Sequence, residues 1–553
     1  MKRVLTVLFL TFLALAADGE TRRVPVFTVQ FSDIRFTSGT ERLKAFADSA
    51  AAYFSEQFSP VTFAVDIYPP FTLDKPRAYY GQNGMDKFDE NLYLAVIEIC
   101  NTLDPIVDFS RYDHDGDGTV DDVVFIFAGT GEESGGGEDA IWPQYGNLPY
   151  MIPPKDGKHI SPYSVCSETS GLGTLCHEYA HSFGLPDWYD TDGEGSGGLA
   201  RGMWGSTSLM DSGRNNDGGA TPPGFNALEF RLCGLGDCEE LAEGSFTLEP
   251  LGRSRRYLHY GDDRVCYIFE CREEAGRDAF IGGSGLLVYH VDRSDRNAGY
   301  SDYYKVDLTA YERWERNQVN CRPDNQCAHI VEADPDADDV RKVFFPQDGI
   351  TRFAPGTELS LTGIRRLDDG SVTFEVIRAL EISGTDIFQD AAIISWTLHE
   401  GITDVRSYTV EWWHGQDGHK SVTLPSGSRS FTLEGLAPGT AYNVRLTAST
   451  DGGGGFSASH AFRTWSVPAN TPPYIYLNSS GRNPDGSFVK DAAIPLRVFN
   501  ATGAAEMRWY FDGRRIDAGA DGFFHPDRSG VLKVEILWEK GGSDIIIKKI
   551  NVR

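Results

Sequence analysis

The sequence of 553 residues has no long apolar run beyond its first residues. Val4–Leu15 is apolar, but it is shorter than the roughly 18 residues that a membrane-spanning helix needs, and no later stretch approaches that length. Positive charge is also scarce, because 51 Lys and Arg face 80 Asp and Glu and leave a net charge of -29. Such a surface repels phosphate backbones and anionic lipid heads. We therefore expect neither a transmembrane span nor a nucleic-acid partner.

Cysteine is rare as well, since only nine occur and none precedes Cys100. No thiol is thus available near the N-terminus for a lipid anchor. An odd number of cysteines leaves at least one thiol without an intramolecular partner. Cys233 with Cys238, and Cys321 with Cys327, are close enough in sequence to form disulfides, although spacing alone does not establish the geometry.

The N-terminus predicts export. Met1-Lys2-Arg3 is positively charged, the apolar segment follows, and small residues end the segment at Ala17. This pattern is typical of a secretory signal peptide, here over residues 1–17. We expect an exported protein that is secreted, periplasmic or held at the cell surface.

The length predicts several domains. In the first part, Val24–Phe31 alternates like a strand, Thr40–Gln57 has helical spacing, and Val123–Phe127 has the pattern of a buried strand. We expect an α/β (α+β) domain at residues 24–235. Short strand-like runs dominate afterwards and predict a β-rich extension at residues 236–378.

Two smaller modules follow. Strand-like segments separated by turn residues predict a β-sandwich at residues 380–465. The proline-rich segment 467–473 is expected to be a stiff, extended linker. Similar strand patterns predict a second sandwich at residues 473–553. The fold class is therefore multidomain, with one α/β domain, a β-rich extension and two small β-sandwiches.

Residues 177–181 read His-Glu-Tyr-Ala-His and carry the pattern of a zinc site. On a helix, His177 and His181 are one turn apart, so both imidazoles can bind one ion. Glu178 stands beside them and can accept a proton from metal-activated water. Gly184 suits the left-handed turn that ends a helix, and this turn can bring Asp187 back as the third ligand.

Several alternatives remain open at this site. Asp190 and Asp192 lie farther along the chain and could compete as the third ligand, and His290 is a remote candidate. Asp190 and Asp192 could instead form a separate cation site with Glu194. Met210 follows a glycine-rich loop and is expected in a turn beneath the metal. The competing structural interpretation is a helix whose histidines only pack or hydrogen-bond.

An acidic loop predicts a second kind of metal site. Asp113, Asp115, Asp117 and Asp121 occupy positions one, three, five and nine of a calcium-binding pattern around a glycine turn. The twelfth position is Val124 rather than glutamate, so the loop is not a full EF-hand. We expect a structural Ca²⁺ site, with a solvated acidic turn as the alternative.

These residues, in this order, resemble the immune inhibitor A-like family of secreted bacterial zinc metallopeptidases. The resemblance covers about residues 24–378, with landmark segments at 53–59, 108–118, 141–143, 177–190, 208–210 and 285–292. It implies a metzincin-like fold and protein or peptide substrates. It also implies a role for each residue of the site, with His177, His181 and Asp187 as Zn²⁺ ligands, Glu178 as catalytic acid/base, and Met210 as the turn methionine.

The two C-terminal modules resemble known binding modules. Residues 380–465 resemble a fibronectin type III module through Trp396 and Leu436–Tyr442, and the resemblance implies that Tyr442 forms a tyrosine corner. Residues 473–553 resemble an immunoglobulin-like sandwich. Such modules act as spacers or bind extracellular or cell-surface proteins.

Two functions from different classes fit these patterns. The first is a secreted zinc-dependent endopeptidase. The second is a catalytically inactive, peptidase-like adhesin that binds proteins through its sandwich modules. The intact Glu178 favours the enzyme, because a protein that only binds has no chemical need for a base beside the metal.

Overall fold

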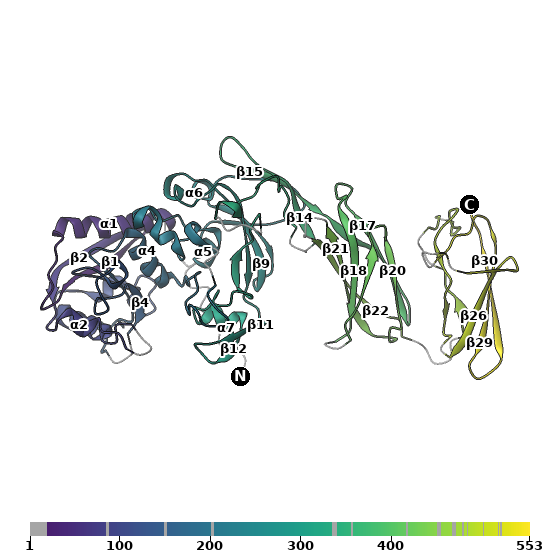
Figure 1. Ribbon diagram of the computed structural model, residues 1–553, viewed down its shortest axis with the longest axis horizontal. Helices are drawn as coiled ribbons and strands as arrows, with labels where there is room; N and C mark the ends of the chain where they lie inside the picture. Colours follow the sequence, from purple (N-terminus) through teal and green to yellow (C-terminus); the bar gives the residue numbers. More distant parts are fainter. Residues whose placement is uncertain are drawn as a thin grey trace. The chain divides into compact units, whose positions relative to one another are not determined.

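A computed structural model describes residues 19–84, 88–148, 152–200, 204–334, 340–354, 358–415, 418–450, 455–466, 472–477, 481–483, 485–501, 503–517, 519 and 523–553 (Figure 1). The chain divides into two compact units. The first comprises Met1–Phe353 and Leu361–Val376, and the second comprises Ala354–Ser360 and Ile377–Arg553. The expected signal peptide and most of the expected linker lie outside the described residues. The finer division into five parts stays a prediction.

The first unit begins with a five-stranded sheet in the order β2-β1-β3-β5-β4. Four strands run parallel, and β4 runs antiparallel to β5 at one edge. The strands are β1 (Thr21–Gln30), β2 (Thr62–Thr72), β3 (Val123–Phe127), β4 (Gln144–Asn147) and β5 (Pro162–Ser167). β3 is buried along its whole length, as expected for a parallel strand covered on both faces.

Helices cover both faces of this sheet. Successive residues of a strand point to opposite faces, so Val26 packs in a core with α1 and α4, while Phe27 packs in a second core with α3. The helices are α1 (Thr40–Gln57), α2 (Arg77–Tyr80), α3 (Leu92–Leu103) and α4 (Leu172–Ala180). The sequence predicted α1 with the bounds that the structure gives.

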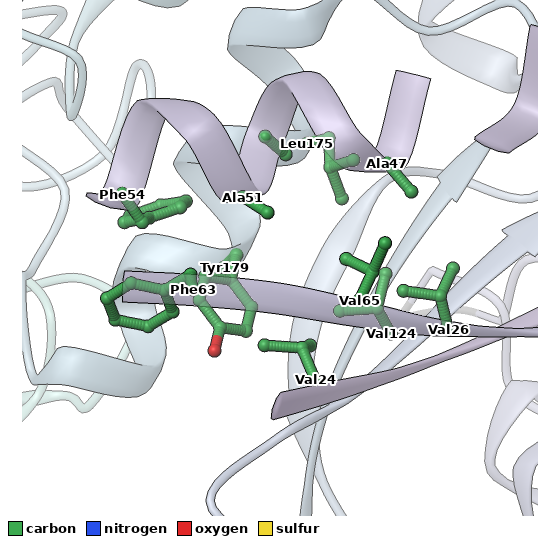
Figure 2. Close-up of a pocket in the computed structure, with 11 residues that line it drawn as sticks. Val24, Val26, Ala47, Ala51, Phe54, Phe63, Val65, Val124, Leu175 and Tyr179 are labelled. Atoms are coloured by element: carbon green, nitrogen blue, oxygen red, sulfur yellow. The ribbon is translucent and has the colours of Figure 1, made fainter. Parts of the chain in front are cut away.

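Figure 2 shows how α1 and α4 pack on the sheet. Ala47 and Ala51 of α1 lie over Val65 of β2, and Leu175 and Tyr179 of α4 reach the same apolar space. The remaining cavity there is about 20 Å³, so the contact is close-packed. Because Leu175 and Tyr179 face this core, another side of α4 is left to carry His177 and Glu178, which line the cleft described below.

The rest of the first unit is rich in strands. One sheet has the order β13-β10-β9-β8-β6, and another has the order β14-β15-β7. Three short helices accompany them, namely α5 (Ala227–Leu232), α6 (Leu251–Ser254) and α7 (Ala310–Glu315). The strands are β6 (Asp237–Glu240), β7 (Gly244–Leu248), β8 (Arg256–Gly261), β9 (Val265–Arg272), β10 (Gly285–Asp292), β11 (Asn297–Ser301), β12 (Val306–Thr309), β13 (Ala328–Ile330), β14 (Leu359–Arg366) and β15 (Val372–Arg378).

The second unit contains a β-sandwich formed by the sheets β16-β17-β20 and β19-β18-β21-β22. Trp396 of β17 packs against Tyr408 of β18 in the core between the sheets. The Tyr442 hydroxyl accepts a hydrogen bond from the Ala437 backbone N–H at 2.9 Å, so the predicted tyrosine corner is confirmed. The strands are β16 (Leu380–Ile387), β17 (Ala391–Leu398), β18 (Val405–Trp413), β19 (Lys420–Pro425), β20 (Ser430–Glu434), β21 (Ala441–Thr450) and β22 (Gly455–Arg463).

The C-terminal part of the second unit has a four-stranded sheet in the order β27-β26-β29-β30 and two short strand pairs, β23 with β25 and β24 with β28. Its immunoglobulin-like character stays a prediction. The strands are β23 (Tyr474–Ile475), β24 (Ile494–Pro495), β25 (Val498–Phe499), β26 (Ala504–Phe511), β27 (Arg514–Ile516), β28 (Phe523–Phe524), β29 (Gly530–Trp538) and β30 (Ser543–Ile550).

All nine cysteines lie in the described part of the chain, and all are free thiols. The disulfides considered from sequence spacing are therefore not formed. Cys233 is buried whereas Cys238 is exposed, so the two side chains lie in different environments. Cys321 and Cys327 are both buried, and the Cys321 thiol lies 3.2 Å from the Thr191 hydroxyl. Within the described residues, no helix is both long and apolar enough to cross a membrane.

We expect Arg272→Met to lower the free energy of unfolding by about 3 to 5 kcal/mol, because it leaves two buried carboxylates without their cation. Arg272 is 1% exposed and pairs with Glu270 and Asp278. Arg264→Met is the control, since Arg264 forms an exposed pair with Asp295 and should change stability by at most about 1 kcal/mol. Denaturant unfolding of both variants measures the difference, and equal losses would contradict it.

Candidate metal centre

Helix α4 carries the predicted metal-binding motif and ends where the sequence indicated. The helix stops at Ala180, a short 3₁₀ turn covers His181–Phe183, and Gly184 follows with φ 80° and ψ 15°. This left-handed conformation costs glycine little, because glycine has no Cβ. The chain reverses at Gly184 and returns Asp187 to the side of α4 that carries both histidines.

Both histidines are oriented by backbone carbonyls. Nδ1 of His177 lies 3.0 Å from the Leu209 oxygen, and Nδ1 of His181 lies 2.7 Å from the Leu185 oxygen. A carbonyl oxygen can only accept a hydrogen bond, so in each neutral ring Nδ1 carries the proton. Each ring therefore leaves its Nε2 lone pair free, as in metal-binding histidines whose other ring nitrogen donates to a carbonyl or carboxylate.

Asp187 faces both Nε2 atoms. Its Oδ1 lies 3.1 Å from Nε2 of His177 and 3.6 Å from Nε2 of His181. With both rings neutral and protonated at Nδ1, no donor among the described residues faces this buried oxygen. Ligands about 2.1 Å from a tetrahedral zinc ion are roughly 3.4 Å apart. The three atoms thus have the spacing and the unshared electron pairs that fit zinc.

The electrostatics of the site favour positive charge between these groups. Burial raises the pKa of Asp187, but the two imidazoles and the Asn317 amide outweigh burial and hold that pKa well below its ordinary value. Burial lowers the pKa of His177, but Asp187 and Glu178 outweigh it and raise that pKa. Burial also raises the pKa of Glu178. A cation between the ligands would relieve the crowding of acceptors.

The ligands open into a cleft of about 430 Å³. Glu178 lines it beside the histidines, and Tyr145 contributes from β4, the edge strand of the first sheet. Tyr189 stacks on the His177 ring with centroids 6.2 Å apart, and the Arg214 guanidinium lies 4.7 Å from the Tyr189 centroid. Both residues also line the cleft.

The floor of the site is a turn at Ser208–Met210. Its Leu209 oxygen bonds His177, and its Met210 oxygen accepts the Trp188 backbone N–H at 3.0 Å. Met210 is fully buried, as expected for a methionine beneath the ligands. Glu229 fixes the turn from below, because one of its oxygens accepts hydrogen bonds from the Ser208 hydroxyl at 2.5 Å and the Trp188 indole at 3.1 Å.

The competing ligands from the sequence lie elsewhere. Asp190 directs its carboxylate to loop backbone N–H groups, including that of Ala200 at 2.7 Å. Asp190 and Asp192 form a group with Cys321 that has metal-ligand spacing, whereas Glu194 belongs to no such group among the described residues. The His290 ring packs against Tyr267 and His329 in the other sheet of the unit.

The sequence did not predict four residues of the site, which are Tyr189, Arg214, Asn317 and Glu229. Tyr189 and Arg214 have no spacing rule that marks them. Asn317 binds Asp187 across 130 positions, so only the folded chain brings the two together. A local signal exists for Glu229, which forms a capping box with Asn226 at the start of α5, but this pattern does not reveal its contact with Ser208.

The acidic loop brings together three of its four predicted ligands. Carboxylate oxygens of Asp113, Asp115 and Asp121 lie within 4.8 Å of one another, while Asp117 is outside this group and caps the Thr119 N–H at 2.7 Å. Lys158 also reaches the loop and pairs with Asp113 at 2.5 Å. The loop therefore has a protein cation beside it that the sequence alone did not indicate.

Comparisons with known proteins show which families two segments of the chain are similar to. Residues 31–229 match the family described as "Immune inhibitor A peptidase M6, catalytic domain", and residues 378–464 match "Fibronectin type III domain". Immune inhibitor A of Bacillus thuringiensis subsp. alesti is 32% identical over 169 residues, which are 26% of this chain and 24% of that protein. Pre-pro-metalloprotease PrtV of Vibrio cholerae serotype O1 is 31% identical over 189 residues, which are 28% of this chain and 20% of that protein.

These matches define the class of the domain that carries α4. Residues 31–229 form a peptidase catalytic domain. More particularly, it is a peptidase M6 domain of the immune inhibitor A type, and a fibronectin type III domain follows it. The matched segments span about a quarter or less of the curated relatives. Among solved structures, the fn3 domain of human contactin 1 is 22% identical, with a TM-score of 0.15 over 16% of this chain and 78% of that one.

We expect Gly184→Ala to lower the free energy of unfolding by about 1 to 2 kcal/mol, because alanine is strained at φ 80°. A Cβ at this position meets no atom within 4 Å, so backbone strain is the whole cost. Gly184→Asn should lose less, since asparagine tolerates this conformation better. Thermal unfolding compares the two variants, and a larger loss for asparagine would show that the strain argument is wrong.

Proposed function

We propose that this chain is an exported zinc-dependent endopeptidase that hydrolyses proteins or peptides. The observation that carries the proposal is the convergence of His177 Nε2, His181 Nε2 and Asp187 Oδ1 beside the buried Glu178. Three free acceptors in a buried space are unfavourable unless a cation lies among them. The family match and the metalloprotease named among the relatives support a metal here, and the donor set of two nitrogens and one oxygen suits zinc.

In this proposal Glu178 is the general base. When bound, zinc polarises the scissile carbonyl and lowers the pKa of water in the cleft. Glu178 accepts a proton from the attacking water and passes it to the departing amine. Burial raises the pKa of this carboxyl, which brings it closer to the value that suits both steps.

The cleft also suggests how an extended peptide is held. Among the strands that the structure describes, β4 pairs with β5 alone, so we propose that its other edge pairs with a substrate strand. Tyr145 of β4 lines the cleft together with Glu178. Arg214 and Tyr189 provide a cation and a hydroxyl in the same cleft. Their proposed role is to stabilise the negative charge that develops on the carbonyl oxygen.

We expect Glu178→Ala to retain one zinc per chain and to lose proteolysis by a factor of about 100 or more. The residue is a base beside the ligand atoms and is not one of them. Zinc content by mass spectrometry and casein hydrolysis are measured on the same sample. A variant with full zinc content and undiminished turnover would rule out Glu178 as the base, whereas loss of zinc would indicate a ligand.

We also propose a structural calcium site at Asp113, Asp115 and Asp121, with Asp117 arranging the loop. Hard carboxylate oxygens at this spacing suit Ca²⁺. Calcium would share Asp113 with Lys158, which already pairs with that carboxylate. The ion would join the end of the loop to its beginning and so stabilise the entry to β3.

Added calcium should raise the thermal midpoint of the wild type, because a ligand that binds only the folded state stabilises it by mass action. Asp115→Ala should abolish most of this shift. Asp48→Ala is the control, since Asp48 is an exposed carboxylate on α1 that pairs with Lys44. If all three proteins show the same shift, calcium binds somewhere other than this loop.

The modules of the second unit are proposed to bind extracellular or cell-surface proteins, or to act as spacers. Fibronectin type III domains occur in both roles. This part of the proposal depends on export through the N-terminal signal predicted over residues 1–17. The inactive-adhesin alternative shares the modules but leaves the buried Glu178 beside three ligand atoms without a chemical role.

A further inference from the structure

The side chain of Asn317, from a distant part of the sequence, holds the carboxylate of Asp187. The Asn317 amide nitrogen donates to Asp187 Oδ2 at 2.7 Å, and the Asn317 amide oxygen accepts the Asp187 backbone N–H at 2.8 Å. One amide therefore contacts both the side chain and the backbone of the proposed third ligand. This two-point contact fixes the rotation of the carboxylate.

The contact also decides which oxygen faces the histidines. Oδ2 is occupied by the Asn317 donor, and Oδ1 is left without a donor, 3.1 Å from His177 Nε2. Without this amide, the carboxylate could turn and present either oxygen or neither. Ordering a free carboxylate on binding costs conformational entropy, so a ligand that is already ordered binds the ion more tightly.

The segment that carries Asn317 is itself anchored to the same loop. It follows α7, and its backbone oxygen accepts a hydrogen bond from the Thr191 hydroxyl at 2.6 Å. Three residues later, the Asn320 amide nitrogen donates to the Trp188 backbone oxygen at 2.9 Å. Residues 317–320 thus hold the loop at Asp187 and at two positions after it, Trp188 and Thr191, and they lie beyond the segment matched by the family, residues 31–229.

We propose that Asn317 is a positioning residue of the metal centre, which sets zinc affinity by fixing Asp187 with Oδ1 toward the two histidines. This inference rests on the proposed zinc site. It assigns part of the β-rich region after residue 235 to that site. Hydrogen-bonding partners of metal ligands typically contribute 10-fold to 100-fold to metal affinity, which is the effect expected of Asn317.

A purely structural role for Asn317 makes a different prediction. Asn317 has φ 52°, a left-handed conformation that glycine adopts more easily than asparagine. Asn317→Gly therefore relaxes the backbone while it removes both hydrogen bonds to Asp187. A matched control is Asn500→Gly in the second unit, where the asparagine has φ 57°.

The test measures the zinc affinity of metal-depleted full-length protein by competition with a chromophoric chelator. The variants are Asn317→Gly, Asp187→Ala, the double variant, His177→Ala and Asn500→Gly, with thermal unfolding of each metal-free protein. We expect Asn317→Gly to weaken zinc binding 10-fold to 100-fold. In the Asp187→Ala background the same change should have no further effect, because Asn317 acts through Asp187. Asn500→Gly should bind zinc like the wild type.

Two outcomes would overturn the inference without touching the proposed zinc site. One is wild-type affinity in Asn317→Gly while His177→Ala has lost zinc. The other is an equal loss from Asn317→Gly with and without Asp187, which would indicate a general effect on folding. If instead the wild type and His177→Ala bind zinc equally, the proposed metal site itself is wrong and the inference falls with it.

Discussion

The proposed metal centre depends on the orientation of two imidazole rings. Because Leu209 and Leu185 present carbonyl oxygens to Nδ1, each neutral ring turns an unprotonated Nε2 toward Asp187 Oδ1. Three acceptors that face one another in a buried space repel unless positive charge lies between them. The backbone carbonyls of Leu209 and Leu185 therefore determine the chemistry of the site. The surrounding structure holds these two carbonyls in place.

Packing and polar contacts share this task. The apolar side of α4, with Leu175 and Tyr179, fixes the helix on the first sheet (Figure 2). Below the ligands, the buried Glu229 holds the Ser208 hydroxyl and the Trp188 indole, and so ties the turn under His177 to the loop after Asp187. Burying an ionisable group is costly unless it is fully hydrogen-bonded. The hydrogen bonds of Glu229 are therefore favourable in one geometry only, so they hold the turn under His177 in one position.

The sequence predicted the features that depend on local patterns. The spacing of apolar residues gave α1 its bounds, and the histidine spacing with Gly184 indicated the helix, its end and the return of Asp187. Contacts between distant segments could not be predicted in this way. Asn317 meets Asp187 across 130 positions, and Lys158 reaches Asp113 across 45. Neither pair has a periodic or spacing signal, because the fold and not the local chain brings them together.

The most direct test of the central claim is the hydrolysis of casein by the purified full-length protein, with a chelator and after zinc is returned. We expect cleavage to stop when the metal is removed and to resume when zinc is restored, because without zinc Glu178 has no activated water to deprotonate. Cleavage that persists in the chelator would contradict a metal mechanism. A protein that holds one zinc per chain and leaves casein intact would contradict the endopeptidase and favour the adhesin.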